Sequence, residues 1–235
     1  MLKTFPVPSL AVVIGASGGI GSALVQALRQ SACFEDVVTL SRSGAPPVDL
    51  LQEDSIRTAA AFIAQRDIPV RMIFDATGFL HGDGLSPEKA MREISPAHMA
   101  HAYAVNAMGP MLLMKYFLPL LPRDGKSVFA TISAKVGSIS DNRLGGWYSY
   151  RAAKAGLNQF VRTAAIELAR KNRQAVCVAL HPGTVETPLS GPFLRSARRL
   201  QTPDEAAAAL LSVLDRLTPA DSGNLIAYDG TTLPF

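Results

Sequence analysis

Residues 10–30 read LAVVIGASGGIGSALVQALRQ and combine three kinds of local structure in one short run. Residues 10–14 are apolar and rich in β-branched side chains, which is typical of a buried strand. Residues 22–30 have the apolar spacing of a helix, and a glycine-rich turn lies between the two segments. The run therefore predicts a strand, a tight turn and a helix in direct succession.

The turn itself, GASGGIG at 15–21, predicts a site for a phosphate group. Gly15 permits the tight turn, Gly19 lets the backbone approach a phosphate, and Gly21 allows close packing of helix and strand. Ser17 and Ile20 belong to the same loop, and the positive end of the helix then faces a pyrophosphate. The G-x-x-x-G-x-G spacing is a weak signal alone, since a plain flexible turn gives the same pattern, but its strand-then-helix context supports a dinucleotide site.

Strands and helices alternate along the rest of the chain. Further strands are predicted at 37–41, 70–76, 126–133, 175–181 and 224–228, with a short one around Val48. Helices are predicted at 55–66, from about Pro96 to Leu121, from the tract at 144–156 to about Lys171, and at 202–217. The last helix has Thr202 as N-cap, Pro203 at its first position and Glu205 at its third.

This alternation predicts the fold class. Strands that are almost wholly apolar suit a parallel sheet covered on both faces. Repeated β-α units imply right-handed crossovers and a Rossmann-like, doubly wound parallel sheet of the α/β class. Because no linker or repeat interrupts the pattern, residues 1–235 are predicted to form a single domain.

The composition narrows the classes of function. Of the 235 residues 48% are hydrophobic and 18% charged, and the net charge is +4 without a dense Lys/Arg block, so nucleic acid is not a predicted partner. Cys33 and Cys177 lie far apart, Cys177 in an apolar run, so we predict a buried inert thiol and no metal site. Since no signal peptide and no apolar run of roughly 18 residues is present, a cytoplasmic protein without membrane contact is predicted.

The end of the second strand bears on the choice of cofactor. Folds that prefer NAD carry Asp or Glu there for the ribose 2′-hydroxyl, whereas this chain has Ser41 followed by Arg42. A guanidinium group holds a 2′-phosphate in a forked, charge-assisted geometry. The sequence therefore favours NADP(H) over NAD(H), although Arg42 would also suit a solvated loop.

The tract LGGWYSYRAAKAG at 144–156 contains a candidate reactive pair. Tyr150 and Lys154 are four residues apart, so on a helix they share one face. A free tyrosine has a pKa of about 10, and a nearby ammonium lowers it toward the range useful for proton transfer. Gly145 and Gly146 predict a turn, and Trp147 is expected to shape or pack against a pocket wall, as is Tyr148.

Three motifs in this order, the glycine loop, YRAAK (150–154) and HPGTVETP (181–188), resemble the short-chain dehydrogenase/reductase superfamily. The resemblance spans essentially the whole chain. Residues 136–158 and the ending LIAYDGTTLPF are most similar to its bacterial C-factor-like and animal sniffer/carbonyl-reductase-like subgroup.

This resemblance implies roles for individual residues. Tyr150 would protonate the substrate oxygen, Lys154 would lower the pKa of Tyr150 and bond the nicotinamide ribose, and Asn106 would hold a water of the proton relay. The further cofactor contacts that it implies are Asp49 at the adenine, Ala76, Thr77 and Gly78 along the cofactor, and Pro182, Gly183, Val185 and Thr187 around the carboxamide.

The chain departs from the family at a serine position. The family pattern Ser-Ser-x-x-Gly corresponds to SAKVG at 133–137, so Ala134 stands where a serine orients the substrate carbonyl. Ser133, Ser138 or no serine fills this role, and Ser133 is the first choice. Turn chemistry at a strand end also accounts for both serines.

Histidines and arginines outside these motifs are expected to have supporting roles. His181 is predicted to be a packed or cofactor-side residue, and His98 and His101 to lie on a solvated helix face. Arg195, Arg198 and Arg199 are predicted to be solvated, with binding of an acidic substrate as the alternative.

The leading functional prediction is an oxidoreductase that transfers hydride between NADP(H) and a carbonyl or alcohol substrate. A dinucleotide-binding regulatory or signalling protein with little turnover is the alternative, since Ala134 lacks a hydroxyl group. Isomerase or dehydratase chemistry on the same scaffold is a third. The family resemblance implies a homodimer or homotetramer.

Overall fold

A mostly parallel sheet forms the centre of the computed structural model, which describes residues 2–196 and 200–235. Among these residues it has seven strands in the order β2-β1-β3-β4-β5-β8-β9. Their bounds are β1 (Leu10–Ile14), β2 (Asp36–Leu40), β3 (Val70–Asp75), β4 (Ser127–Ile132), β5 (Ala175–His181), β8 (Leu225–Ala227) and β9 (Thr232–Leu233). Neighbours from β2 to β8 pair in parallel, and β9 pairs antiparallel with β8.

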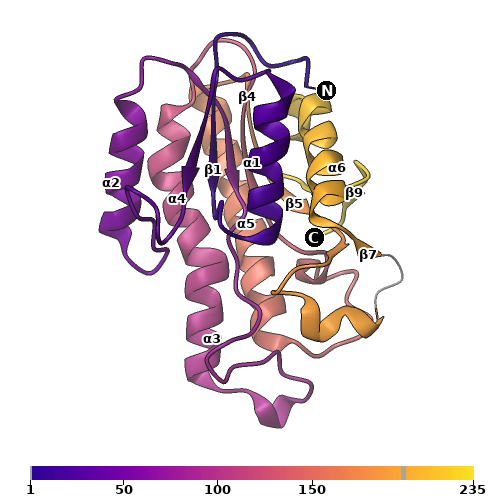
Figure 1. Cartoon of the computed structure of the whole chain (residues 1–235). Helices are drawn as coiled ribbons and strands as arrows, with labels where there is room; N and C mark the ends of the chain where they lie inside the picture. Colours follow the sequence, from indigo (N-terminus) through magenta and orange to yellow (C-terminus); the bar gives the residue numbers. More distant parts are fainter. Residues whose placement is uncertain (1, 197–199) are drawn as a thin grey trace.

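Helices cover both faces of this sheet (Figure 1). One face packs against α1 (Gly19–Ser31) and α6 (Pro203–Arg216), and the other against α2 (Glu53–Ala64), α4 (Gly109–Phe117) and α5 (Tyr148–Lys171). Successive residues of β1 serve opposite faces: Ala11 joins the core under α1, and Val12 joins the core under α2. This arrangement is the predicted Rossmann-like doubly wound fold.

The turn between β1 and α1 requires glycine for two separate reasons. Gly15 has φ +78°, a left-handed conformation that glycine adopts at little cost. At Gly21 an added Cβ would overlap the carbonyl oxygen of Gly15, so α1 packs against the loop only with glycine at this position. The G-x-x-x-G-x-G spacing thus follows from the close approach of helix and turn.

The predicted helix from Pro96 to Leu121 is interrupted. It consists of α3 (Pro96–Tyr103), a π-helical turn (Ala104–Met108), α4, and a closing 3-10 turn (Leu118–Leu120). In Figure 1, α3 extends beyond the edge of the sheet. A π-helical turn widens a helix locally and is frequent at functional sites.

The short strand predicted around Val48 is wrong. The segment forms only an isolated bridge between Ser41 and Pro47, and the Val48 N–H donates to the Ser41 carbonyl at 2.9 Å. The two preceding prolines, Pro46 and Pro47, have no N–H to donate, so a regular ladder does not form there. The two-residue pair β6 (Thr184–Val185) and β7 (Leu200–Gln201) was not predicted.

The predicted ends of α5 and α6 are confirmed. α5 spans Tyr148–Lys171, and the Thr202 side chain accepts from the Glu205 N–H in a capping box at the start of α6. None of the helices in the described part of the chain is long and apolar enough to cross a membrane.

Candidate active site

Two pockets lie at the carboxyl edge of the parallel strands, where ligands of doubly wound folds bind. The first, which we call the glycine-loop pocket, has a volume of about 400 Å³ and lies beyond β1, β2 and β3. The second, the tyrosine pocket, has about 280 Å³ and lies beyond β4 and β5. The segment after β3 borders both, because Phe79 lines the first and Leu80 the second.

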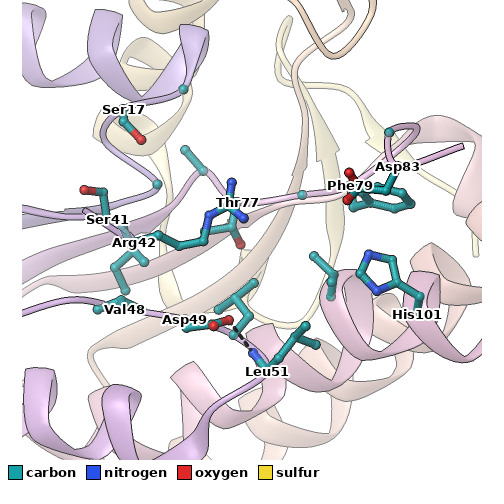
Figure 2. Close-up of a pocket in the computed structure, with 18 of the residues that line it drawn as sticks. Ser17, Ser41, Arg42, Val48, Asp49, Leu51, Thr77, Phe79, Asp83 and His101 are labelled. Carbon is teal, nitrogen blue, oxygen red and sulfur yellow. Dashed lines mark hydrogen bonds between the residues drawn. The ribbon is translucent and has the colours of Figure 1, made fainter. Parts of the chain in front are cut away.

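The glycine-loop pocket brings together most of the residues predicted to hold the nucleotide. Figure 2 shows Ser17, Ser41, Arg42 and Asp49 at one end, and Phe79, Asp83 and His101 toward the other. The predicted residues that line it are Gly15, Ser17, Ser41, Arg42, Asp49, Ala76, Thr77 and Gly78. The Arg42 guanidinium and the hydroxyl groups of Ser17 and Ser41 thus line one end of this pocket.

Asp49 is held by its own loop. Its Oδ1 accepts from the Leu51 N–H at 3.0 Å, and its N–H donates to Ser55 Oγ at 2.9 Å. These bonds fix the edge of the glycine-loop pocket between Val48 and Leu51, which sequence reasoning treated as a single contact at Asp49.

The remaining loop residues lie apart from this pocket. Ile20 lines the tyrosine pocket, and a Cβ on Gly19 would lie 2.8 Å from Thr187 Cγ2. The glycine loop is therefore in close contact with the segment after β5. Pro182, Gly183, Val185 and Thr187 all line the tyrosine pocket beside Tyr150.

Aromatic rings form one wall of the tyrosine pocket. The Trp147 ring lies edge-on to Tyr150, with centroids 6.1 Å apart, and to Phe193 at 5.2 Å. Trp147 lines the pocket as predicted, whereas Tyr148 does not. Leu80, Ile132 and other apolar side chains make most of the lining of this pocket apolar.

Tyr150 and Lys154 lie together on one face of α5. Lys154 is 1% exposed, its Nζ lies 5.8 Å from the centre of the Tyr150 ring, and it donates to the Ile132 carbonyl at 2.8 Å. Burial lowers the pKa of Lys154 to about 8. Burial also raises the pKa of Tyr150, opposite to the sequence-based expectation, because desolvation disfavours the charged phenolate.

Asn106 lies within the π-helical turn and reaches the segment after β3. Its Nδ2 donates to the carbonyls of Phe79 at 2.8 Å and Ala102 at 3.0 Å, and its Oδ1 accepts from the Phe79 N–H at 2.9 Å. A Cβ on Gly78 would lie 3.5 Å from Asn106 Oδ1 and 3.9 Å from Lys154 Nζ. Asn106 and Lys154 therefore converge at Gly78.

Asp75, at the end of β3, is a buried carboxyl that sequence reasoning missed. It accepts from the Thr77 N–H at 3.0 Å, from Thr77 Oγ1 at 2.5 Å and from Thr131 Oγ1 at 2.6 Å. Burial raises its pKa, and the charge of Lys154 acts in the opposite direction. The sequence feature that could have identified Asp75 is its position as the last residue of a strand, directly before Ala76–Gly78.

The two candidate serines lie in different surroundings. Ser133 lines the tyrosine pocket together with Ala134 and Tyr150, is 1% exposed, and donates from Oγ to Asn158 Oδ1 at 2.7 Å. Ser138 Oγ instead accepts from the Asp141 N–H at 3.2 Å, in the turn that follows. Of the two serines, only Ser133 borders the pocket.

The expectation of a solvated face for His98 is wrong. His98 is 5% exposed and its Nδ1 lies 3.2 Å from Glu88 Oε1, because the loop after β3 folds back over α3. His101 packs edge-on against Phe79, with ring centroids 4.5 Å apart. His181 lines the tyrosine pocket, and burial lowers its pKa to about 4, so it is neutral at pH 7.

Other predictions concern cysteine, metal and basic residues. Cys177 is buried, as predicted, and burial raises the pKa of its thiol to about 12. Over residues 2–196 and 200–235, His, Cys, Asp and Glu side chains form no group able to hold a metal ion. The basic segment of Arg195, Arg198 and Arg199 lies outside the described side chains.

The fold and these two pockets define a nucleotide-binding enzyme of the α/β class, and comparison with known proteins gives its family. A family model described as enoyl-(acyl carrier protein) reductase matches residues 20–230. The chain is 30% identical over 239 residues to 1-hydroxy-2-glutathionyl-2-methyl-3-butene dehydrogenase of Rhodococcus sp. (strain AD45), covering 97% of this chain and 100% of that one. The chain belongs to the short-chain dehydrogenase/reductase family and is an oxidoreductase.

Two further similarities fall within the predicted subgroup. The C-signal protein of Myxococcus xanthus is 35% identical over 146 residues, which is 62% of this chain and 84% of that one. The NADPH-bound carbonyl reductase from chicken fatty liver superposes with a TM-score of 0.83 at 26% identity, over 98% of this chain and 100% of that one. The predicted resemblance is therefore confirmed.

Proposed function

We propose that the protein is an NADP(H)-dependent carbonyl reductase that interconverts a small aldehyde or ketone and its alcohol. The observation that supports this most directly is the Tyr150–Lys154 pair: Tyr150 lines a largely apolar pocket next to the glycine loop, and the buried Lys154 ammonium lies 5.8 Å from the centre of its ring. The similar chicken protein is a carbonyl reductase bound to NADPH, which agrees with this reaction and cofactor.

The residues fit a dinucleotide phosphate. The loop approaches the segment after β5 so closely that a Cβ on Gly19 would meet Thr187, which leaves backbone rather than side chains facing a pyrophosphate. Ser41 and Arg42 would hold the 2′-phosphate, and Asp49 the adenine end. The other residues proposed to hold the cofactor are Gly15, Ser17, Ile20, Gly21, Ala76, Thr77, Gly78, Tyr150, Lys154, Pro182, Gly183, Val185 and Thr187.

When bound, NADP(H) supplies or accepts the hydride. The Tyr150 phenol, whose raised pKa keeps it protonated at neutral pH, donates its proton to the carbonyl oxygen during reduction. Lys154, with a pKa of about 8, is mostly charged at pH 7 and stabilises the phenolate that forms. Trp147 and the other apolar side chains that line the tyrosine pocket lower the polarity around this transfer.

We propose that Asn106 orders the relay region beside Lys154, and that Ser133 is the hydroxyl nearest the carbonyl. The Ser133 proton is engaged by Asn158 Oδ1, so its contribution to orienting the substrate is small. Ala134 offers only a methyl group at the family's serine position.

The test is NADPH oxidation with a panel of aldehydes, ketones and quinones, for the wild type and Tyr150→Phe. Loss of the proton donor should lower kcat/KM by about 100-fold or more, while the variant still binds NADPH, as fluorescence should show. If the wild type binds NADPH but reduces no substrate faster than Tyr150→Phe does, the reductase proposal is wrong.

A second candidate function is a signalling protein that binds NADP(H) with little turnover. Ala134 and the similarity to the C-signal protein favour it. The same assay separates the two, because the signalling candidate expects NADPH binding without turnover of any carbonyl compound.

A further inference from the structure

Glu88 is a buried carboxylate that belongs to neither pocket. It lies in the loop between β3 and α3 and is 2% exposed. Its Oε2 accepts from the Ser149 N–H at 3.1 Å, its Oε1 accepts from the Ser149 hydroxyl in a short hydrogen bond, and His98 Nδ1 lies 3.2 Å from Oε1. A buried carboxylate is costly unless it is paired or hydrogen-bonded, and Glu88 accepts two hydrogen bonds from Ser149.

These contacts place Glu88 at the N-terminus of α5, the helix that carries Tyr150 and Lys154. The first N–H groups of a helix have no partner within the helix, and the helix end favours negative charge. Trp147, the residue before α5, makes no side-chain capping bond. Glu88, 61 positions away from Ser149, supplies the anionic acceptor instead.

The ionised form of Glu88 is the one that fits this role. Burial alone would raise the pKa of Glu88, but the hydrogen bonds from Ser149, together with His98, lower it below the ordinary value of 4.5. At neutral pH the helix end therefore faces a carboxylate.

The backbone of Glu88 holds the residue before the helix as well. Its carbonyl accepts from the Trp147 N–H at 2.5 Å, and Trp147 has the left-handed φ of +55°. The Trp147 ring in turn contacts Tyr150 and Phe193 in the wall of the tyrosine pocket. One residue thus fixes the first turn of α5 from two sides, through Trp147 and through Ser149.

We propose that Glu88 is a positioning residue for Tyr150: it clamps the first turn of α5 so that the phenol and the Trp147 wall keep their places at the tyrosine pocket. The inference rests on the proposed reductase function for its kinetic consequence. Glu88 acts through Trp147 and Ser149 and touches no residue proposed to react.

The variants Glu88→Ala and Glu88→Gln test this, with two readouts. Trp147 is the only tryptophan in the chain, so its emission and its quenching by acrylamide report on this segment alone. Glu88→Ala should red-shift and expose the tryptophan and lower kcat by about 10- to 100-fold, since small misplacements of a reacting group cost this much. NADPH should still bind, because the glycine loop and Arg42 lie on other elements, and kcat is therefore measured at saturating NADPH. Glu88→Gln keeps an oxygen acceptor for Ser149 and should recover part of kcat.

Two further variants make the experiment selective. Glu93→Ala is the matched control: Glu93 lies in the same loop and accepts the Lys89 N–H at 2.8 Å, but it is exposed and this hydrogen bond stays within the loop, so kcat and emission should stay unchanged. Ser149→Ala removes only one donor to Glu88, and it replaces Glu88→Ala as the test variant if Glu88→Ala does not fold. It should shift emission and kcat in the same direction by a smaller factor.

The inference is overturned if folded Glu88→Gln, Glu88→Ala and Ser149→Ala keep wild-type kcat and emission, even where their melting temperatures fall, since Glu88 would then be merely structural. If the wild type itself reduces no carbonyl compound, the reductase proposal fails on its own. The emission and quenching of Trp147 still decide whether Glu88 clamps the helix.

Discussion

At the scale of a single residue, the protonation of Lys154 sets the highest pH at which the active site keeps its full activity. Burial lowers its pKa from 10.5 to about 8, so the ammonium is present below pH 8 and is lost as the pH rises above it. Tyr150 stays protonated over this range because burial raises its pKa. We expect kcat/KM for carbonyl reduction at saturating NADPH to be flat near pH 7 and to fall from about pH 8 upward. A pH profile measures this directly.

Lys135 provides the control for that profile, since this lysine lines the tyrosine pocket. Lys135→Met should leave the alkaline limb where it is, because its ammonium is half exposed and lies outside the Tyr150–Lys154 pair. A wild-type profile that stays flat to pH 10 would exclude Lys154 as the titrating group.

Because Ala134 stands where the family has a serine, we predict different effects for substitutions at Ser133 and at Ala134. Ser133→Ala should lower kcat by less than about tenfold, well short of the 100- to 1,000-fold cost of losing a full oxyanion donor, because its proton goes to Asn158. Ala134→Ser should raise kcat by placing a hydroxyl in the lining of the tyrosine pocket. Steady-state kinetics of both variants decide the matter, and a 100-fold loss in Ser133→Ala would instead make Ser133 the main donor.

Single residues were predictable from sequence where helix geometry alone brings them together. Tyr150 and Lys154 share a face because they are four residues apart, and the structure has both on α5. Asp75, Glu88 and His98 were not recognised, since their roles depend on burial and on partners across loops. The loop after β3, which brings Glu88 to both His98 and Ser149, has no periodicity from which its path could be derived.

At the scale of elements, Gly18 and Gly21 of the β1–α1 turn look alike in sequence but differ in how closely they pack. A Cβ on Gly21 would overlap the Gly15 carbonyl oxygen, whereas one on Gly18 would lie 3.4 Å from it, an ordinary contact. Gly21→Ala should therefore displace α1 from the loop, weaken NADPH binding by at least about tenfold, and lower the melting temperature. Gly18→Ala, the matched control, should keep the wild-type melting temperature, because it does not force α1 away from the loop. Equal melting temperatures for the two variants would contradict this packing argument.

Elements differ in how far their sequences specify them. β1 is a continuous apolar run buried on both faces, and β5 is one up to its last residue, so their sequences are sufficient to predict strands. The strands β6, β7 and β9 are each only two residues long, so their sequences have no detectable hydrophobic period. The π-helical turn around Asn106 was also missed, because one extra residue in a turn hardly disturbs the apolar spacing.

At the scale of the whole molecule, the site depends on segments far apart in the chain that meet at one edge of the sheet. The parallel order β2-β1-β3-β4-β5 aligns the carboxyl ends of all five strands. The glycine loop, the Arg42 segment, residues 75–81, Tyr150 and residues 181–187 follow from that topology. Sequence therefore predicted which segments meet, while the shape of the tyrosine pocket depends on loops whose paths it does not specify.

Cofactor preference can be measured as a property of the whole molecule. A ligand that binds only the folded state at 100 times its Kd stabilises it by about 2.7 kcal/mol, which for a chain of this size raises the melting temperature by roughly 5–10 °C. We expect NADPH to give such a shift and NADH a smaller one. Arg42→Asp should weaken NADPH binding by about 10- to 100-fold, the value of a hydrogen bond between charged groups, and strengthen the response to NADH. Arg173→Asp makes the same change of charge at an exposed position by the amino end of β5. It should therefore keep the wild-type result, in which NADPH raises the melting temperature more than NADH does. If NADPH stabilises Arg42→Asp and Arg173→Asp equally, Arg42 does not bind the 2′-phosphate.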